Sequence, residues 1–284
     1  MSNKSLISDI KAWAVSAGVA PRSFDCKFYD QCNGQNVMLD RGNTAVMSYL
    51  GREYGEPSVP AMPRLVIVGM DHGCHASLTF DERREQIEEY ESDTAGNFNP
   101  HYAGVVRTAA AFLGRHGTHC ADACRARCAR SRGPVAVDVC VLDRLAQPNL
   151  VKCVSSTVPN ATCKATRVMR TNCCNHLVAE LGLLRPDIVV VHGIKEQCRV
   201  LKHMEIHGIE HFDLGERIGI SKVLYNAPGL GCHFVFLWHP SRNMMDRIWA
   251  LRAVPTITYL TELGIIPAAP PVARPGRGPV GPGG

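Results

Sequence analysis

The feature that most constrains the fold of this chain is a series of short apolar segments, each followed by a polar or glycine-containing turn. Three are apolar runs within residues 64–68, 188–191 and 234–237, and a fourth, less regular segment covers residues 147–151. Apolar runs without polar alternation are typical of parallel strands that are buried on both faces of a sheet. A fifth, shorter strand is expected near residues 223–225.

Stretches with helical spacing of apolar residues lie between these segments. We expect helices at residues 103–113, 168–184 and 242–263, and a short amphipathic helix near the start of the chain. The alternation of strand and helix predicts an α/β fold with three layers and a central parallel sheet of four strands.

Ligand sites in such sheets lie outside the carboxyl ends of the strands. Four short segments follow the expected strands: residues 70–73, 149–153, 192–195 and 239–241.

The remaining sequence features indicate the domain organisation, the location and the partners of the protein. Residues 1–267 are expected to form a single domain, and the Pro/Gly-rich residues 268–284 a disordered tail. No apolar run approaches the length of a membrane span, and the start of the chain lacks the pattern of an export signal. We therefore expect the protein to lie in the reducing cytoplasm, without a membrane partner. We also expect a monomer. The net charge of +5 slightly favours polyanionic partners.

Several side chains in the strand-end segments have chemistry that suits catalysis or binding. Asp71, in the turn that follows residues 64–68, suits a general base or the stabilisation of a cation, or else caps a turn. Asn149 suits recognition of an amide-like edge, or else begins a strand. His239 suits stabilisation of an anion, or is simply a turn residue. Tyr102, at the start of a predicted helix, stacks on a base or packs into the core.

The chain has 13 cysteines, which in a reducing compartment are expected to bind metal or to be buried rather than to form disulfides. Cys26 and Cys32 lie in a polar N-terminal segment, Cys153 follows the second strand, and Cys173 and Cys174 lie in a predicted helix. Such separated thiolates suit an iron–sulfur cluster or a structural zinc ion. A second group has helical spacing and is a weaker metal candidate: Cys120, Cys124 and Cys128. Core or surface roles are expected for the others: Cys74, Cys140, Cys163, Cys198 and Cys232.

The order of these segments resembles that of the uracil-DNA glycosylase superfamily, and most closely its iron–sulfur branch. The segments that carry the resemblance are an N-terminal cysteine pair followed by GMDHG, HYAGVVRTAAAFLG, NLVKC, NCCNHLVAEL, RPDIVVVHG and WHPSR. They extend from about residue 24 to residue 250. Each motif is short, so the specificity lies in their common order.

The resemblance implies a role for each matching position. Asp71 matches the residue that positions water or stabilises the sugar cation, and His239 the residue that stabilises the departing base. Asn149 matches the residue that reads the uracil edge, and Tyr102 an aromatic that stacks on the flipped base. The glycine turn adds Gly69 and His72 as expected substrate contacts.

The resemblance also implies a [4Fe–4S] cluster, for which zinc is the alternative, held by Cys26, Cys32, Cys153 and Cys173. Cys174 is an alternative fourth ligand, although the His-Leu that follows in the sequence favours Cys173. The implied activity is hydrolysis of the N-glycosidic bond of uracil or a related deaminated base in DNA, as in base excision repair. The alternative function is a non-catalytic iron–sulfur protein of the same fold that binds nucleic acid.

Overall fold

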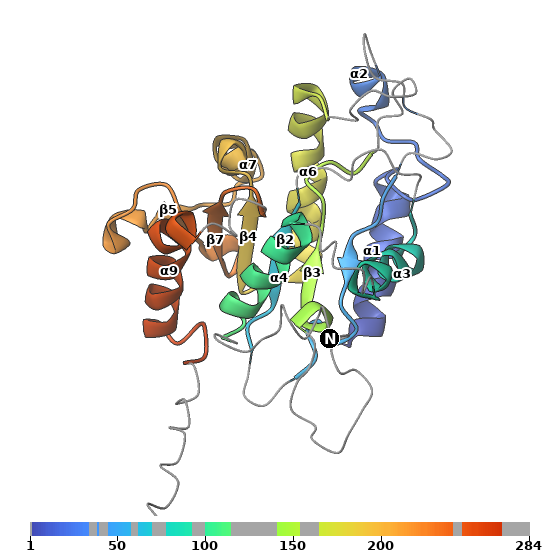
Figure 1. Ribbon diagram of the computed structural model, residues 1–284. Coiled ribbons are helices and arrows are strands. Elements are labelled where there is room, and N and C mark those ends of the chain that lie inside the picture. The colour runs from blue at the N-terminus through green and yellow to red at the C-terminus, as the bar shows by residue number, and fades with distance from the viewer. Residues whose placement is uncertain are drawn as a thin grey trace, which may run out of the picture.

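The computed structural model describes residues 2–33, 39, 45–57, 62–69, 78–92, 100–114, 141–153, 165–240 and 246–268. Within these ranges the protein has a mixed α/β fold built on one seven-stranded sheet (Figure 1). The strands lie in the order β1-β3-β2-β4-β7-β6-β5. Their bounds are β1 Tyr49–Leu50, β2 Leu65–Val68, β3 Leu145–Gln147, β4 Ile188–His192, β5 Phe212–Asp213, β6 Leu224–Ala227 and β7 Cys232–Leu237.

The central strands β3, β2, β4 and β7 run parallel, whereas β1, β6 and β5 pair antiparallel at the two edges. The expected number of four strands is therefore too small, because three antiparallel strands extend the sheet at its edges. The edge strands β1 and β5 have only two residues each, too few for a recognisable apolar pattern. The strand expected near residues 223–225 is β6, which joins the sheet antiparallel to β7.

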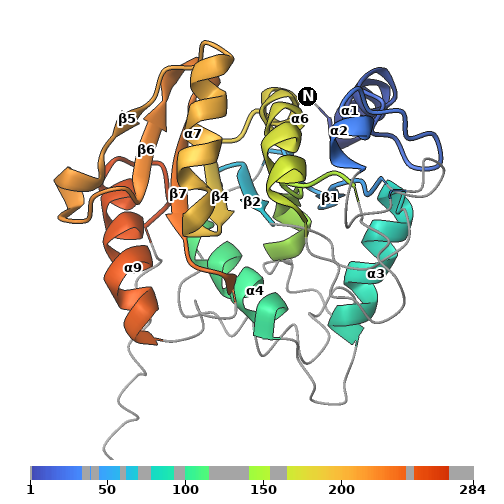
Figure 2. The ribbon, with the colours of Figure 1, turned by 90° about the horizontal axis from the view of Figure 1, so that it is seen from above.

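Alternate side chains of the central strands enter two hydrophobic cores on opposite faces of the sheet. Val189 and Val191 of β4 contribute to one core, and Ile188 and Val190 to the other. Helices cover both faces (Figure 2). The first core contains residues of α1 (Asn3–Ser16), α2 (Tyr29–Cys32), α6 (Arg167–Leu184) and α7 (Gln197–Ile206). The second contains residues of α3 (Phe80–Ser92), α4 (Pro100–Phe112) and α9 (Asp246–Glu262).

The second predicted strand is misplaced. It was expected over residues 147–151, but β3 ends at Gln147. Pro148 follows and has no backbone N–H, so it cannot continue the ladder of hydrogen bonds. One parallel bridge beyond it joins Gly69 to Asn149. The strand-end segment that begins at Asn149 is therefore a loop held against the end of β2.

The other predicted strands and helices lie close to their expected places. α4 and α6 begin within a few residues of the expected positions. α9 is described from Asp246 onward, and residues 242–245 of the expected helix lie outside the described residues, as do residues 269–284 of the expected tail. No helix in the described ranges has the length and apolar character needed to cross a membrane.

Candidate functional site at the strand ends and the cysteine cavity

Gly69 and Asn149 lie in direct contact at the carboxyl end of the parallel strands. The Gly69 amide donates to the Pro148 carbonyl over 2.9 Å, and the Leu150 amide donates to the Gly69 carbonyl over 2.7 Å. A Cβ atom at Gly69 would lie 2.9 Å from Oδ1 of Asn149. The absence of a side chain at Gly69 therefore leaves the space that the Asn149 carboxamide occupies.

The Asn149 side chain carries a buried donor. Asn149 is 3% exposed, and its Nδ2 has no hydrogen-bond partner among the described residues. An unpaired buried N–H is costly, typically about 1–3 kcal/mol. Such a group at the end of a strand is a candidate for ligand recognition, because a ligand oxygen would satisfy it.

The segment with His239 lies against the start of α4. His239 is exposed and follows β7, whose last residue, Leu237, accepts a hydrogen bond from the Gly193 amide beyond β4. A Cβ atom at Gly104 would lie 2.0 Å from the Pro240 carbonyl oxygen, so only glycine permits this approach. The contact places the N-terminal part of α4 beside the His-Pro segment, at the same end of the parallel strands as Asn149.

Not all predicted site residues are described. Tyr102 lies in the first turn of α4, but its side chain is outside the described part of the structure. Asp71 and His72 also lie outside the described residues. The structure thus brings Gly69 and Asn149 together and brings the Tyr102 and His239 segments together.

His192 is a further polar residue at the strand ends, for which the sequence analysis predicts no specific role. It ends β4 and is 1% exposed. Its Nε2 lies 3.3 Å from the Thr108 hydroxyl, which donates to the Gly104 carbonyl over 2.7 Å. The pair links the end of β4 to α4, next to the contact between Gly104 and Pro240. Its position at the end of an apolar run was the only signal in the sequence.

Four cysteines line a single small cavity. About 250 Å³ of space between atoms lies here, part of it open to solvent, and the sulfur-bearing lining residues are Cys26, Cys32, Cys153 and Cys173. All four are buried. They come from the N-terminal segment, the loop after β3 and α6, so the fold gathers thiols that are separated by up to 147 positions (173 − 26). These are the four ligands that the resemblance implies.

The cavity distinguishes Cys173 from its neighbour. Cys174 is buried but does not line the cavity, and it interacts with Arg199 instead. Of the remaining cysteines, Cys198 is exposed and Cys232 is buried, in keeping with surface and core roles. The others lie outside the described residues: Cys74, Cys120, Cys124, Cys128, Cys140 and Cys163.

The thiols of the cavity differ in acidity. The Cys153 thiol donates to Cys173 Sγ, and this hydrogen bond raises the pKa of Cys153 and lowers that of Cys173. Burial raises the pKa of Cys26 to about 11 and also raises that of Cys32. Four buried thiols do not ionise together without a compensating cation. A metal group bound by thiolates would supply that positive charge.

Four cysteines are the donor set of an iron–sulfur cluster and of a structural zinc ion alike. The residues around the cavity fit either group by donor type, number and burial. As they stand in the described ranges, no three or more His, Cys, Asp or Glu side chains are arranged to hold a metal ion.

A buried ion pair adjoins this cavity. Lys152, one of its lining residues, pairs through Nζ with Oε2 of Glu180 on α6, and Ser48 donates to the other carboxylate oxygen. The Lys152 and Glu180 side chains are 4% and 1% exposed. Sequence reasoning missed this pair, although Lys152 adjoins Cys153 and Glu180 lies two helical turns after Cys173.

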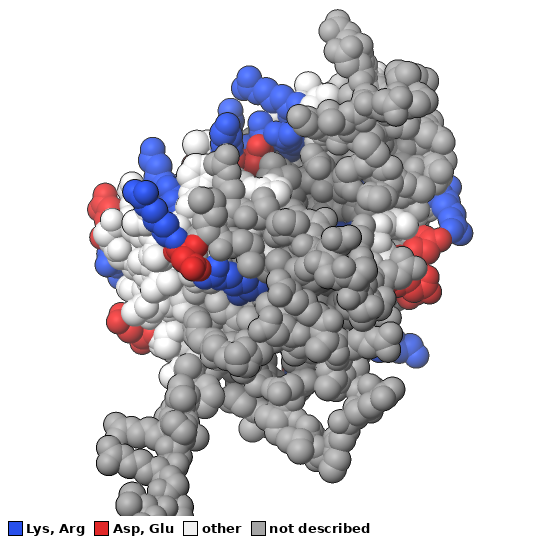
Figure 3. All heavy atoms as spheres, in the orientation of Figure 1, with Lys and Arg blue, Asp and Glu red and all other residues white. Residues whose placement is uncertain are grey.

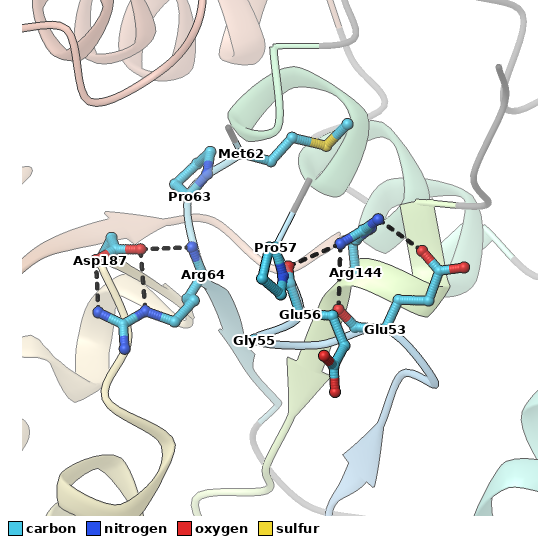
Figure 4. A pocket seen from close by; sticks show the side chains of 9 residues that line it. All are labelled: Glu53, Gly55, Glu56, Pro57, Met62, Pro63, Arg64, Arg144 and Asp187. Carbon is cyan, nitrogen blue, oxygen red and sulfur yellow. Dashed lines mark hydrogen bonds and ion pairs between the residues drawn. The ribbon is translucent and has the colours of Figure 1, made fainter. Parts of the chain in front are cut away.

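A second, larger pocket lies at the amino ends of the parallel strands (Figure 4). It is an open pocket of about 680 Å³, solvent space included, near Arg64 and Asp187, which precede β2 and β4. Both guanidinium groups that line it are paired. Arg64 contacts Asp187 over 2.9 Å, and Arg144 contacts Glu53 over 2.7 Å. The charged side chains that line the pocket therefore pair with one another, and the pocket lies away from the carboxyl ends of the strands, where Asn149 and His239 lie.

No protein-family model matches this chain, and no curated protein matches it in sequence. What the strand-end site and the cysteine cavity do must therefore be inferred from their own geometry and chemistry.

Proposed function

We propose that the protein is a DNA glycosylase that removes uracil or a related deaminated base and is braced by a [4Fe–4S] cluster. The observation that carries the proposal is the meeting of Cys26, Cys32, Cys153 and Cys173 around one cavity. The sequence resemblance selects these four from 13 cysteines by motif order alone. Their gathering supports that resemblance, and so does the block of four parallel strands in the sheet.

The unpaired amide of Asn149 supports recognition of uracil. Nδ2 is a donor, and the base edge of uracil that distinguishes it from cytosine carries a carbonyl oxygen at position 4. Cytosine has an amino group there, which would place a donor against a donor and leave both unsatisfied. A site that holds a buried polar group discriminates strongly against a ligand that fails to satisfy it.

The remaining strand-end residues suit the cleavage step. Breaking the N-glycosidic bond develops positive charge on the sugar and negative charge on the departing base. His239, beyond β7, is proposed to donate to the base as it leaves. Asp71, beyond β2, is proposed to stabilise the sugar cation or to orient water, and Tyr102 to stack on the flipped base. The cluster serves as a structural brace, away from the reacting bond.

Basic side chains near the same edge favour a nucleic-acid partner. Lys and Arg side chains gather at the top of the view in Figure 3, around α7 and the upper part of α6. Arg167 and Arg170 lie in the first turn of α6, and Lys195 lies just beyond β4. α6 precedes β4, so its first turn lies toward the carboxyl ends of the strands. Phosphate groups bind such surfaces through counterion release.

The direct test is release of free base. Anaerobically purified, iron-loaded protein is incubated with single-stranded and duplex oligonucleotides that contain uracil, hypoxanthine or xanthine, and the liberated base is measured. We expect release of at least one base by the wild type. The isosteric Asn149→Asp variant replaces the donor by an acceptor and should lose about 100-fold or more, as when one transition-state donor is removed.

Two outcomes contradict the proposal. Folded, iron-loaded protein that leaves every deaminated base in place is not a glycosylase for these lesions. Equal release by the wild type and Asn149→Asp would exclude Asn149 as the base-reading residue and indicate a contaminating enzyme. Salt-dependent DNA binding without release would instead establish the non-catalytic alternative.

A further inference from the structure

We propose that Asn172 and His176, on α6, are positioning residues that donate N–H groups to the ligand sulfurs and thereby set the reduction potential of the bound cluster. This inference rests on the cluster of the proposed function. It concerns two residues that flank Cys173 but are not ligands themselves. The structure assigns them this role through their contacts with sulfur.

Polar N–H groups surround the sulfurs of the cavity. The Phe28 amide donates to Cys26 Sγ and the Lys152 amide to Cys173 Sγ, each over 3.5 Å. Two side chains add to these backbone donors. Asn172 Nδ2 donates to Cys32 Sγ over 3.5 Å, and His176 Nε2 lies 3.3 Å from Cys26 Sγ. Three of the four sulfurs therefore have a nearby N–H group.

The helix explains why these two residues reach the cavity. Asn172 adjoins Cys173 toward the start of α6, and His176 lies three positions after it, on the same face of the helix. α6 thus supplies one ligand and two side-chain donors. The ring of His176 is fixed by edge-on contacts with Phe28 and Trp13, whose centroids lie 5.9 and 6.4 Å away. His176 is 5% exposed, so its ring has little freedom to turn away from the sulfur.

Hydrogen bonds to thiolate sulfurs stabilise the more negative state of a cluster. Four thiolates and a [4Fe–4S] core carry net negative charge, which increases when the cluster takes up an electron. Each N–H donor offsets part of that added charge, so it raises the reduction potential. Removing a donor should make the potential more negative, and it should also weaken retention of the metal.

The test is a spectroelectrochemical titration of anaerobically reconstituted, full-length protein. Asn172→Leu and His176→Phe keep the approximate shape of each side chain but remove the donor. In each variant we expect the ratio of reduced to oxidised cluster at a fixed potential to fall about tenfold, which is a shift of about 59 mV for one electron. His176→Gln keeps an N–H donor and should restore most of the shift.

Asn175→Leu is the matched control, because Asn175 lies on the same helix and contacts the Asn172 carbonyl and His207 rather than sulfur. Its potential should equal that of the wild type. If Asn172→Leu and His176→Phe also match the wild type, the inference is overturned while the cluster stands. If His176→Phe does not fold, the half-buried Asn172 carries the test alone. Reconstituted wild type that binds no iron would instead overturn the cluster on which the inference rests.

Discussion

At the scale of single residues, the proposed base-reading group depends on a glycine. The Asn149 carboxamide is buried against Gly69, where a Cβ atom would lie 2.9 Å from Oδ1. Gly69 has no positive φ angle, so its role is to leave space rather than to adopt a special backbone conformation. A side chain at this position would meet a side-chain atom, which has to move.

Gly69→Ala tests this dependence. We expect the added methyl group to displace the Asn149 amide and to lower base release about 100-fold, the loss typical of a misplacement of about 1 Å. Gly182→Ala is the control, because a Cβ atom there meets nothing within 4 Å. In the helical position of Gly182, alanine should stabilise the fold by about 0.5–1 kcal/mol without changing activity. Full activity of a folded Gly69→Ala protein would show that the carboxamide does not act in base recognition.

At the scale of elements, the long apolar strands were predictable because burial on both faces imposes a continuous apolar pattern. β2, β4 and β7 lie where that pattern predicts them. β3 was misplaced because its apolar residues precede Pro148, and the two-residue strands β1 and β5 leave no pattern at all.

The candidate site was predictable to a similar degree. Cysteines and strand-end polar residues are chemically conspicuous, so their positions stand out in the sequence. Glu180, Asn172 and His176 acquire roles only through partners that lie far away in the chain, such as Lys152, Cys32 and Cys26. Tertiary packing decides such pairs, and helical spacing alone does not reveal them.

The ion pair between Lys152 and Glu180 joins the loop after β3 to α6, and it predicts a large effect on stability. Lys152→Met leaves a buried carboxylate without its cation, which should cost about 3–5 kcal/mol. The double variant Lys152→Met/Glu180→Leu should be more stable than Lys152→Met alone, because no unpaired charge remains. The measurement is denaturant unfolding of the purified proteins.

Lys202→Met, an exposed lysine of α7, is the control for this pair and should change stability by less than about 0.5 kcal/mol. If Lys152→Met were as stable as this control, the pair would contribute nothing to holding the loop after β3 on α6.

At the scale of the whole molecule, one five-residue loop connects the two proposed centres. Asn149 lies at the strand-end site, and Cys153 lines the cysteine cavity. Between them, the Lys152 amide donates to Cys173 Sγ and the Lys152 side chain pairs with Glu180. Binding of a metal group by Cys153 and Cys173 would therefore also fix the loop that presents Asn149. A cluster remote from the reaction would in this way be needed for base recognition.

The charge distribution of the whole molecule makes a further prediction about DNA. Arg167 and Lys195 are exposed near the carboxyl ends of the strands, where the substrate strand is proposed to bind. The double variant Arg167→Glu/Lys195→Glu should weaken binding of single-stranded DNA. It should also reduce the slope of log K against log salt by about 0.7 for each lost phosphate contact. Fluorescence anisotropy over a series of salt concentrations measures both quantities.

Lys4→Glu reverses a charge at the start of α1, which lies beside the N label in Figure 1. In Figure 1 the start of α1 lies well below the upper end of α6, so this variant should change binding only through the net charge of the protein. If the double variant binds with the same salt slope as Lys4→Glu, the α6 and β4 side chains do not contact phosphate. DNA would then have to approach the strand ends from another side, although Asn149 could still read the base.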